Sequence, residues 1–260
     1  MTDYTNSAKR LIAVLAEASK RNGDEATGKV WASVFGLPWD DYHPDPHFVQ
    51  QKLAVLRGEI DYLEAQMRRT QFSQEGYVQH LGRIRRSISR GNVDAPWKSY
   101  FGELFAPDVQ LALLWCSQVI PNEATVTVAE LEKVLGEIKA LRSSIDSLGI
   151  SQAVRDFILQ QLDLIEQAIQ EYPIRGGAAI REGFHKAAAI YAAAEDVPFT
   201  KAEAENVGKV NRLFSRLGKA TEGVIKADKL ASAVLSIAEK SGRAGNAIAD
   251  AIDKLPSLGP

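Results

Sequence analysis

The residues with the most evident chemistry lie in a proline-rich segment near the N-terminus. Residues 40–47 read Asp-Asp-Tyr-His-Pro-Asp-Pro-His, with two imidazoles and three carboxylates that zinc or another divalent cation can take as ligands. The prolines hold the backbone extended and separate neighbouring side chains, so a complete site needs a further ligand from elsewhere. The alternative is a solvated turn whose aspartates cap the helix after Pro46. The metal hypothesis rests on Asp41, His43, Asp45 and His47.

A second candidate site is the basic segment from residue 68 to residue 98, which contains seven Lys and Arg residues and two acidic residues. Basic residues near aromatic residues can hold a nucleic-acid backbone and stack a base. The alternative is an arginine face that pairs with acidic helices of the same fold or of a partner, and residues 120–172 supply such a complement. We favour protein contacts, because opposite charged surfaces commonly set helix and subunit register. The candidate partner-binding residues are Arg68, Arg69, Arg83, Arg85, Arg86, Arg90 and Trp97.

Two further motifs fail in their context. Residues 23–29 match a phosphate-binding loop up to Lys29, but Val30 replaces the hydroxyl residue and a polar helix end precedes the first glycine. Glu182 and His185 have the spacing of a di-iron helical bundle, but no second Glu-x-x-His occurs. We therefore predict no nucleotide site, no cofactor and no catalytic residue, although catalytic residues scattered along the sequence would escape such a search.

The composition is that of a soluble globular protein. The 260 residues are 45% hydrophobic and 25% charged with a net charge of −2, so any binding to nucleic acid or anionic lipid must come from a local patch. The sequence contains no apolar run of membrane-spanning length and no signal-like start, which predicts a cytoplasmic protein. The single cysteine, Cys116, lies in an apolar run and is expected to be a buried, inert thiol.

Proline-free intervals with helical periodicity indicate an all-α protein. The longest regular pattern is a heptad frame from 49 to 88 with one missing core position, Gln74. It predicts either one helix of about 40 residues forming a coiled-coil arm, or two helices broken at Ser73, and its continuity favours a long helix or two nearly collinear ones. The frame consists of Val49, Leu53, Leu56, Ile60, Leu63, Met67, Thr70, Tyr77, Leu81, Ile84 and Ile88.

A helical hairpin is predicted for residues 127–172. Thr127 and Glu130 form a capping box before one apolar stripe, Gly149 ends that helix, Ser151 caps the next, and Pro173 follows it. Two stripes of equal length with a short connection are typical of antiparallel helices.

The C-terminal region is predicted from weaker signals. A small-residue helix follows Pro173, and a capping box at 200–203 opens another helix. The Ala-rich stretch 224–238 is interpreted as a packed terminal helix or subunit contact, with a membrane-surface helix as the alternative.

These features predict an all-α helical bundle with an N-terminal region (1–120), which contains the arm, and a C-terminal region (121–260), or one continuous domain. The predicted function is non-catalytic protein binding or self-assembly, with a protein partner or a second copy of the chain. A nucleic-acid-binding accessory protein using the segment from Arg68 to Lys98 is the alternative, and peripheral membrane association through the C-terminal helix is the second alternative.

Overall fold

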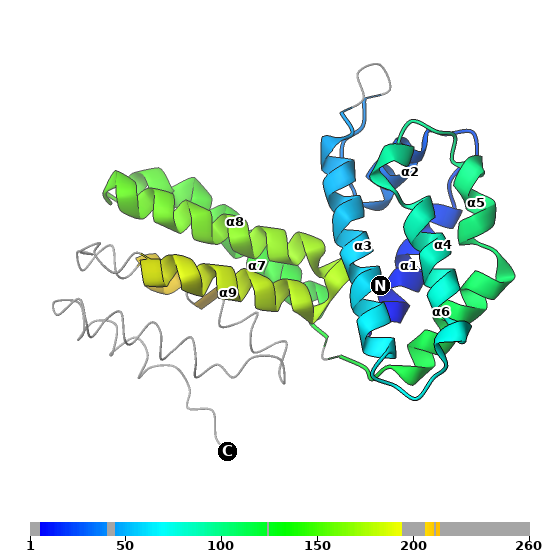
Figure 1. The fold of residues 1–260 in the computed structure, drawn as a ribbon. Helices are drawn as coiled ribbons and strands as arrows, with labels where there is room; N and C mark the ends of the chain where they lie inside the picture. The colour runs from blue at the N-terminus through cyan, green and yellow to red at the C-terminus, as the bar shows by residue number, and fades with distance from the viewer. Residues whose placement is uncertain (1–5, 41–44, 124, 194–205, 211, 214–260) are drawn as a thin grey trace. The chain divides into compact units, whose positions relative to one another are not determined.

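The computed structural model of the chain describes residues 6–40, 45–123, 125–193, 206–210 and 212–213 (Figure 1). The described residues are mostly helical, with an isolated bridge between Ala26 and Pro96 as their only β pairing, so the all-α prediction is confirmed. The chain divides into a first unit, Met1–Glu123 with Pro173–Gly176, and a second unit, Ala124–Tyr172 with Gly177–Pro260. The chain therefore leaves the first unit after Glu123 and returns to it for four residues.

The first unit is built around its N-terminal helix. Its helices are α1 (Ser7–Ser19), α2 (Thr27–Val34), α3 (His47–Met67), α4 (Val78–Ser87), α5 (Lys98–Leu104) and α6 (Pro107–Val119), with 3-10 turns at Gln74–Gly76 and Arg90–Asn92. Helix α1 packs on α2, α3 and α6, and buries one broad face. Its buried residues are Ser7, Ala8, Arg10, Leu11, Val14, Leu15 and Ala18.

For residues 49–88 the structure has two helices, as one of the two alternatives predicts, but the favoured long helix or nearly collinear pair is wrong. The apolar frame positions are buried in the first unit, but α3 ends at Met67 and α4 begins at Val78. Arg85 of α4 pairs with Asp61 and Glu64 of α3, so α4 runs back along α3 rather than continuing it. The heptad spacing identifies the residues that face the core. Two helices that fold back on each other can share one core, so the same spacing does not require a continuous helix.

The second unit contains the predicted hairpin. Its described helices are α7 (Val128–Ser144), α8 (Gln152–Arg175) and α9 (Gly177–Ala193), with a 3-10 turn at Ile145–Ser147. The capping box forms as predicted: Thr127 Oγ1 accepts from the Glu130 backbone N–H, and the Glu130 carboxylate accepts from the Thr127 backbone N–H. Gly149 has a φ of +62°, which a glycine at a helix end adopts without strain.

Charged pairs fix the register of this hairpin. Arg142 on α7 pairs with Asp163 and Glu166 on α8, and Arg155 pairs with Asp146 at the turn, a pattern that requires antiparallel helices. The α8 stripe from Val154 to Tyr172 is buried as expected. Helix α8 nevertheless continues through Pro173 to Arg175, so the prediction that Pro173 lies after the helix is wrong.

Small residues bring α8 and α9 together. A Cβ on Gly183 would lie 3.0 Å from the Cβ of Ala168 and 3.4 Å from the Leu164 carbonyl oxygen, so the glycine permits close packing there. Val207, Val210 and Leu213 also belong to this core. The predicted capping box at 200–203 and the Ala-rich stretch 224–238 lie outside the described residues.

Candidate interaction surface and buried polar network

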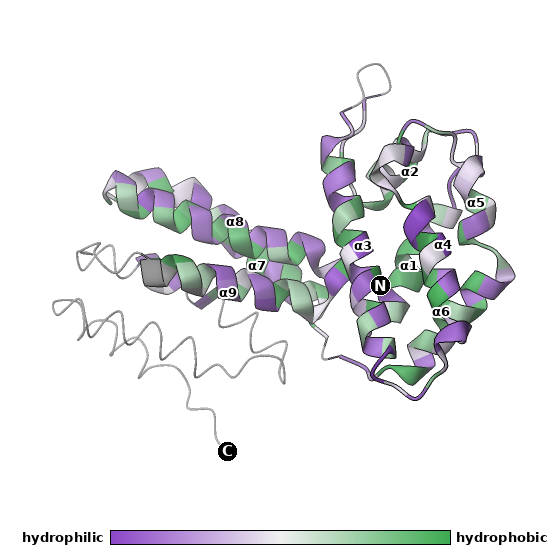
Figure 2. Ribbon diagram, in the orientation of Figure 1, coloured by the Kyte–Doolittle hydropathy of each residue, from purple (hydrophilic) through white to green (hydrophobic). Residues whose placement is uncertain are grey.

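The outer face of α6 carries the most prominent group of exposed apolar side chains in the first unit. Its inner face, which includes Val109, Leu113 and Cys116, is buried in the core. The opposite face carries large apolar residues together with the exposed Gln118, and Figure 2 shows hydrophobic residues (green) along much of this helix. We define the α6 face as its four exposed large apolar residues, with exposed fractions of 45%, 50%, 46% and 37%: Leu111, Leu114, Trp115 and Val119.

This face is positioned by contacts of α6 with α4 and with the connection between α3 and α4. Trp115 makes an edge contact with Phe72, with ring centroids 6.0 Å apart, which orients the indole beside the turn between α3 and α4. At the N-terminal end of α6, Asp108 accepts a hydrogen bond from Arg83 at 2.6 Å. Large apolar residues grouped on an uncovered helix face make the α6 face a candidate interaction surface.

The arginines of the basic segment have different surroundings. Arg83 pairs with Glu103 and Asp108, Arg85 with Asp61 and Glu64, and Arg68 with Glu64. The hydrogen bond from Arg85 and burial act in opposite directions on Glu64, and the net effect lowers its pKa. The partners therefore come from α3, α5 and α6 of the first unit rather than from residues 120–172. Arg83 and Arg85 link α4 to neighbouring helices, whereas Arg68 pairs within the end of its own helix.

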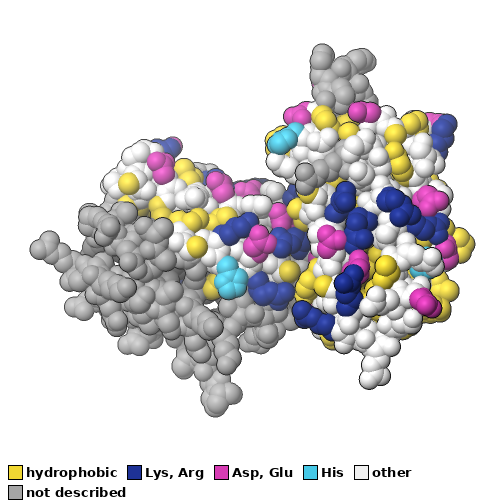
Figure 3. All heavy atoms as spheres, in the orientation of Figure 1, with side chains coloured by type: hydrophobic (Ala, Val, Ile, Leu, Met, Phe, Trp, Pro, Cys, Tyr) yellow, Lys and Arg dark blue, Asp and Glu magenta, His cyan; other side chains and the backbone are white. Residues whose placement is uncertain are grey.

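Arg69 and Arg86 are exposed, and neither has an ion pair among the described residues. The side chain of Arg90 lies outside the described residues. On the face shown in Figure 3, Lys and Arg side chains gather over α3 and α4 with Asp and Glu side chains among them. As far as its side chains are described, the basic segment thus forms a mixed surface on which Arg69 and Arg86 have no ion pair, rather than a continuous positive patch.

Trp97 does not belong to the exposed surface. Its side chain is fully buried, makes edge contacts with Trp31, Phe101 and Phe105, and forms part of the first core. The prediction that Trp97 contacts a partner is corrected on this point, because an indole closed in by other aromatic rings is not accessible for stacking.

The segment that resembles a phosphate-binding loop is used for pairing within the fold. The backbone N–H groups of Thr27 and Gly28 donate to the carbonyl oxygens of Ala95 and Val93, at 2.8 and 2.7 Å. A Cβ on Gly28 would overlap the ring of Trp39. These amides have protein partners, so the segment acts as the predicted connection between helices.

Half of the predicted metal loop lies outside the described residues, namely Asp41 and His43. In the other half, the Asp45 carboxylate accepts from the His47 backbone N–H at 2.9 Å, and His47 Nε2 lies 2.8 Å from Gln51 Nε2. Asp45 therefore satisfies a free donor in the first turn of α3, as the alternative interpretation expects. Among the described residues, no group of three metal-ligating side chains comes together.

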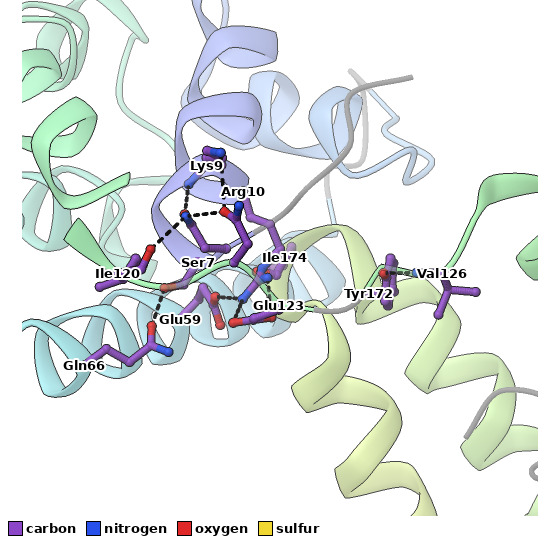
Figure 4. Close-up of polar contacts among 12 residues, drawn as sticks. Ser7, Lys9, Arg10, Glu59, Gln66, Ile120, Glu123, Val126, Tyr172 and Ile174 are labelled. Atoms are coloured by element: carbon purple, nitrogen blue, oxygen red, sulfur yellow. Dashed lines mark hydrogen bonds and ion pairs between the residues drawn. The ribbon is translucent and has the colours of Figure 1, made fainter. Parts of the chain in front are cut away.

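The least expected site in the first unit is a fully buried arginine. The guanidinium of Arg10 donates to Glu59 at 2.5 Å, to Glu123 at 2.7 Å and to the carbonyl oxygen of Ile174 at 3.1 Å (Figure 4). These partners come from α3, from the last residue before the chain leaves the first unit, and from the returning segment 173–176. Arg10 thus connects α1 with three other segments.

Burial dominates the electrostatics of this network. It raises the pKa of Glu59 to about 7 from an ordinary value of 4.5, although the nearby charge and hydrogen bond of Arg10 act in the opposite direction. Burial also lowers the pKa of Arg10, but the carboxylates of Glu123 and Glu59 more than offset it, so the net shift is upward. Arg10 is therefore permanently charged, whereas Glu59 titrates near neutral pH.

Polar groups at the start of α1 complete the network. Asn6 caps the helix by accepting from the Lys9 N–H, and its amide donates to the Ser117 carbonyl oxygen at 3.0 Å. Ser7 Oγ donates to Gln66 Oε1 at 2.7 Å, while Arg10 lies beside them in Figure 4. The buried polar side chains of Asn6, Ser7, Arg10 and Glu59 are all paired, whereas Gln66 and Glu123 are partly exposed, so the network stabilises the fold.

Comparison with protein families, with curated proteins and with solved structures finds no match to this chain. None of the described helices combines the length and apolar character needed to span a bilayer. What the protein does must therefore be argued from its own surface.

Proposed function

We propose that this chain is a non-catalytic helical protein that binds a protein partner, or a second copy of itself, through the α6 face. The observation that supports this proposal is the clustering of Leu111, Leu114, Trp115 and Val119 on one exposed side of α6. Grouped large apolar residues at a surface mark interaction sites, and a half-exposed tryptophan is a common anchor residue in protein interfaces.

The α6 face is a better candidate than the basic segment. Three of the arginines there are already paired within the first unit, so a partner would have to replace existing ion pairs. Covering the α6 face removes apolar area from water and requires no polar group to lose a partner.

Native purification of the tagged full-length chain from the cells that produce it tests the proposal. We expect a companion chain in stoichiometric amount, whether another protein or an untagged copy, with the wild type and with the control variant Phe48→Asp. The control residue is 54% exposed and lies on α3, outside the α6 face. Leu114→Asp should lose the companion while keeping wild-type circular dichroism and thermal stability.

If the companion persists in Leu114→Asp, or if the wild type carries none, the proposal is wrong. Should Leu114→Asp fold poorly, Leu111→Asp tests the same face at a position that is also nearly half exposed.

A nucleic-acid-binding role is a second candidate, favoured by the exposed Arg69 and Arg86. It predicts oligonucleotide binding that weakens steeply with salt and is lost in Arg69→Glu/Arg86→Glu, whose folding should be unaffected. Fluorescence anisotropy at low salt measures this directly, and absence of binding by the wild type excludes the role.

A further inference from the structure

The returning segment 173–176 is attached to the first unit by few contacts. Ile174 is its only buried large side chain, 3% exposed and part of the first core. The Ile174 carbonyl oxygen accepts from Arg10 Nε at 3.1 Å, and Gly176 lies against the same guanidinium. Pro173 lies inside α8 without a backbone N–H to donate, which weakens the helix where the segment begins. A short segment with so few buried contacts opens more readily than the helices around it.

One guanidinium holds both the segment and the point at which the chain leaves the first unit. Besides Ile174, Arg10 pairs with Glu123, the last residue before the chain leaves, at 2.7 Å, and with Glu59 of α3 at 2.5 Å (Figure 4). We call Arg10, Glu59, Glu123 and the Ile174 carbonyl the Arg10 cluster. The packing of α1 on α2, α3 and α6 does not involve the segment. Weakening the cluster therefore loosens residues 173–176 while these helix contacts stay in place.

The cluster contains a group whose ionisation opposes the closed arrangement. The charged groups that act on Glu59 are Arg10 of α1, Arg175 of α8 and Glu123 after α6. Burial outweighs the two arginines and raises the pKa of Glu59 to about 7 while the segment is in place. Departure of the segment uncovers this carboxyl and lets its pKa return towards 4.5. The closed form thus binds the proton more tightly than the open form, and rising pH favours opening.

We infer that residues 173–176 open as a unit while the helices of the first unit stay folded, and that rising pH favours this opening through the Arg10 cluster. Opening withdraws Ile174 from the first core and uncovers the guanidinium of Arg10. The device is separate from the α6 face and goes beyond the proposed function.

Hydrogen exchange of the full-length chain tests both parts of this inference. Protection factors compare each amide with an unstructured chain at the same pH, so the intrinsic pH dependence of exchange cancels. The amides of Ile174 and Arg175 should be less protected than the buried amides of α1 at every pH, because they exchange through a local opening. Their protection in the wild type should fall about tenfold from pH 6 to pH 8, as Glu59 ionises.

Two variants on α3 identify the group that titrates. Glu59→Gln keeps the size of the side chain but cannot ionise, so the fall in protection between pH 6 and 8 should disappear. Glu64→Gln is the matched control on the same helix, and its fall should equal that of the wild type. The inference is overturned if the protection of residues 174 and 175 equals that of α1, or if Glu59→Gln retains the wild-type fall.

Glu123→Gln serves as a second variant should Glu59→Gln fold poorly. Glu123 is partly exposed, and its charge raises the pKa of Glu59. Removing that charge should move the fall in protection of residues 174 and 175 to lower pH. A fall at the wild-type pH would show that the Arg10 cluster does not control the opening.

Discussion

Gly176 lies directly against the guanidinium of Arg10, and a Cβ at this position would overlap Nη1 and Cζ of Arg10 and lie 2.9 Å from a Glu123 carboxylate oxygen. The backbone of Gly176 also has a φ of +55°, in the region where residues with side chains are strained. The returning segment 173–176 can therefore reach the buried network only with glycine at its end.

Gly176→Ala should destabilise the first unit by about 2–4 kcal/mol, from the backbone strain together with the overlap with Arg10. Gly36→Ala is the matched control, since Gly36 has a φ of +65° in the same unit but no atom within 4 Å of its added Cβ. We expect Gly36→Ala to lose only about 1 kcal/mol in urea unfolding. Equal losses for both variants would show that the contact with Arg10 contributes nothing.

The pH dependence of the free energy of unfolding should reveal the titration of Glu59. Its pKa is raised to about 7 in the folded protein, so its contribution is fully present below about pH 4.5 and is lost as the pH rises through 7. The free energy of unfolding of the wild type, measured relative to Glu59→Gln, should fall across this window by up to about 3 kcal/mol.

Glu64→Gln is the contrasting variant, because the pKa of Glu64 is lowered. The contribution of Glu64 is present above its ordinary pKa and is lost as the pH falls through the lowered one. The difference in unfolding free energy between wild type and Glu64→Gln should therefore be constant between pH 5 and 7 and should shrink as the pH falls below about 4.5. A difference between wild type and Glu59→Gln that stays constant with pH would contradict the assigned titration.

The stability of the first unit should depend on both hydrogen-bonding groups of the Asn6 side chain. Asn6→Ala removes the cap of α1 and leaves the buried Ser117 carbonyl without this donor, which together should reduce stability by about 2–3 kcal/mol. Asn6→Asp keeps the capping oxygen but loses the amide donor, and separates the two effects. Chemical denaturation measures both, and a loss below about 0.5 kcal/mol for Asn6→Ala would refute the role of this residue.

Gln161, in the second unit, is a buried polar side chain whose replacement should raise stability. Its side chain is fully buried, and its amide oxygen and nitrogen have no hydrogen-bond partner among the residues that the structure describes. Gln161→Leu should raise the stability of this unit by about 1 kcal/mol, since an unpaired buried amide is replaced by an apolar group of similar size. Gln160→Leu on the exposed side of the same helix controls for helix propensity and should change little. A destabilised Gln161→Leu variant would indicate that the amide is paired in solution.

The sequence predicted the local features of this fold better than its connections. The capping box at Thr127 and the turn at Gly149 could be recognised because each is formed by residues close together in the chain. Heptad spacing identified buried positions from Val49 to Ile88, but the same spacing suits a continuous helix and two antiparallel helices that share a core. The chain turns back between Met67 and Val78 because α3 packs on α1 and α4 packs on α6. These contacts join residues far apart in the sequence, so no local pattern predicts them.

Both candidate sites were missed for related reasons. The sequence places Cys116 and its apolar run in the core. The Cys116 side is buried, but Leu111, Leu114 and Trp115 are exposed on the opposite side. Arg10 looks like an ordinary surface arginine until its position is noticed: Ala8, Leu11 and Val14 surround it on the helix, which indicates burial. Its partners Glu59, Glu123 and Ile174 are 49, 113 and 164 residues away, beyond the reach of spacing arguments.

The return of the chain at 173–176 has a consequence for biosynthesis. Ile174 is part of the first core, and its carbonyl oxygen is one of the acceptors of Arg10, so the N-terminal 123 residues lack pieces of their own interior. As the protein emerges from the ribosome, this unit has to wait for the whole α7–α8 hairpin to be synthesised before its buried arginine is fully paired. Residues 173–176, which complete the first unit, are thus synthesised some fifty residues after Glu123. The α7–α8 hairpin can therefore fold before the first unit is complete.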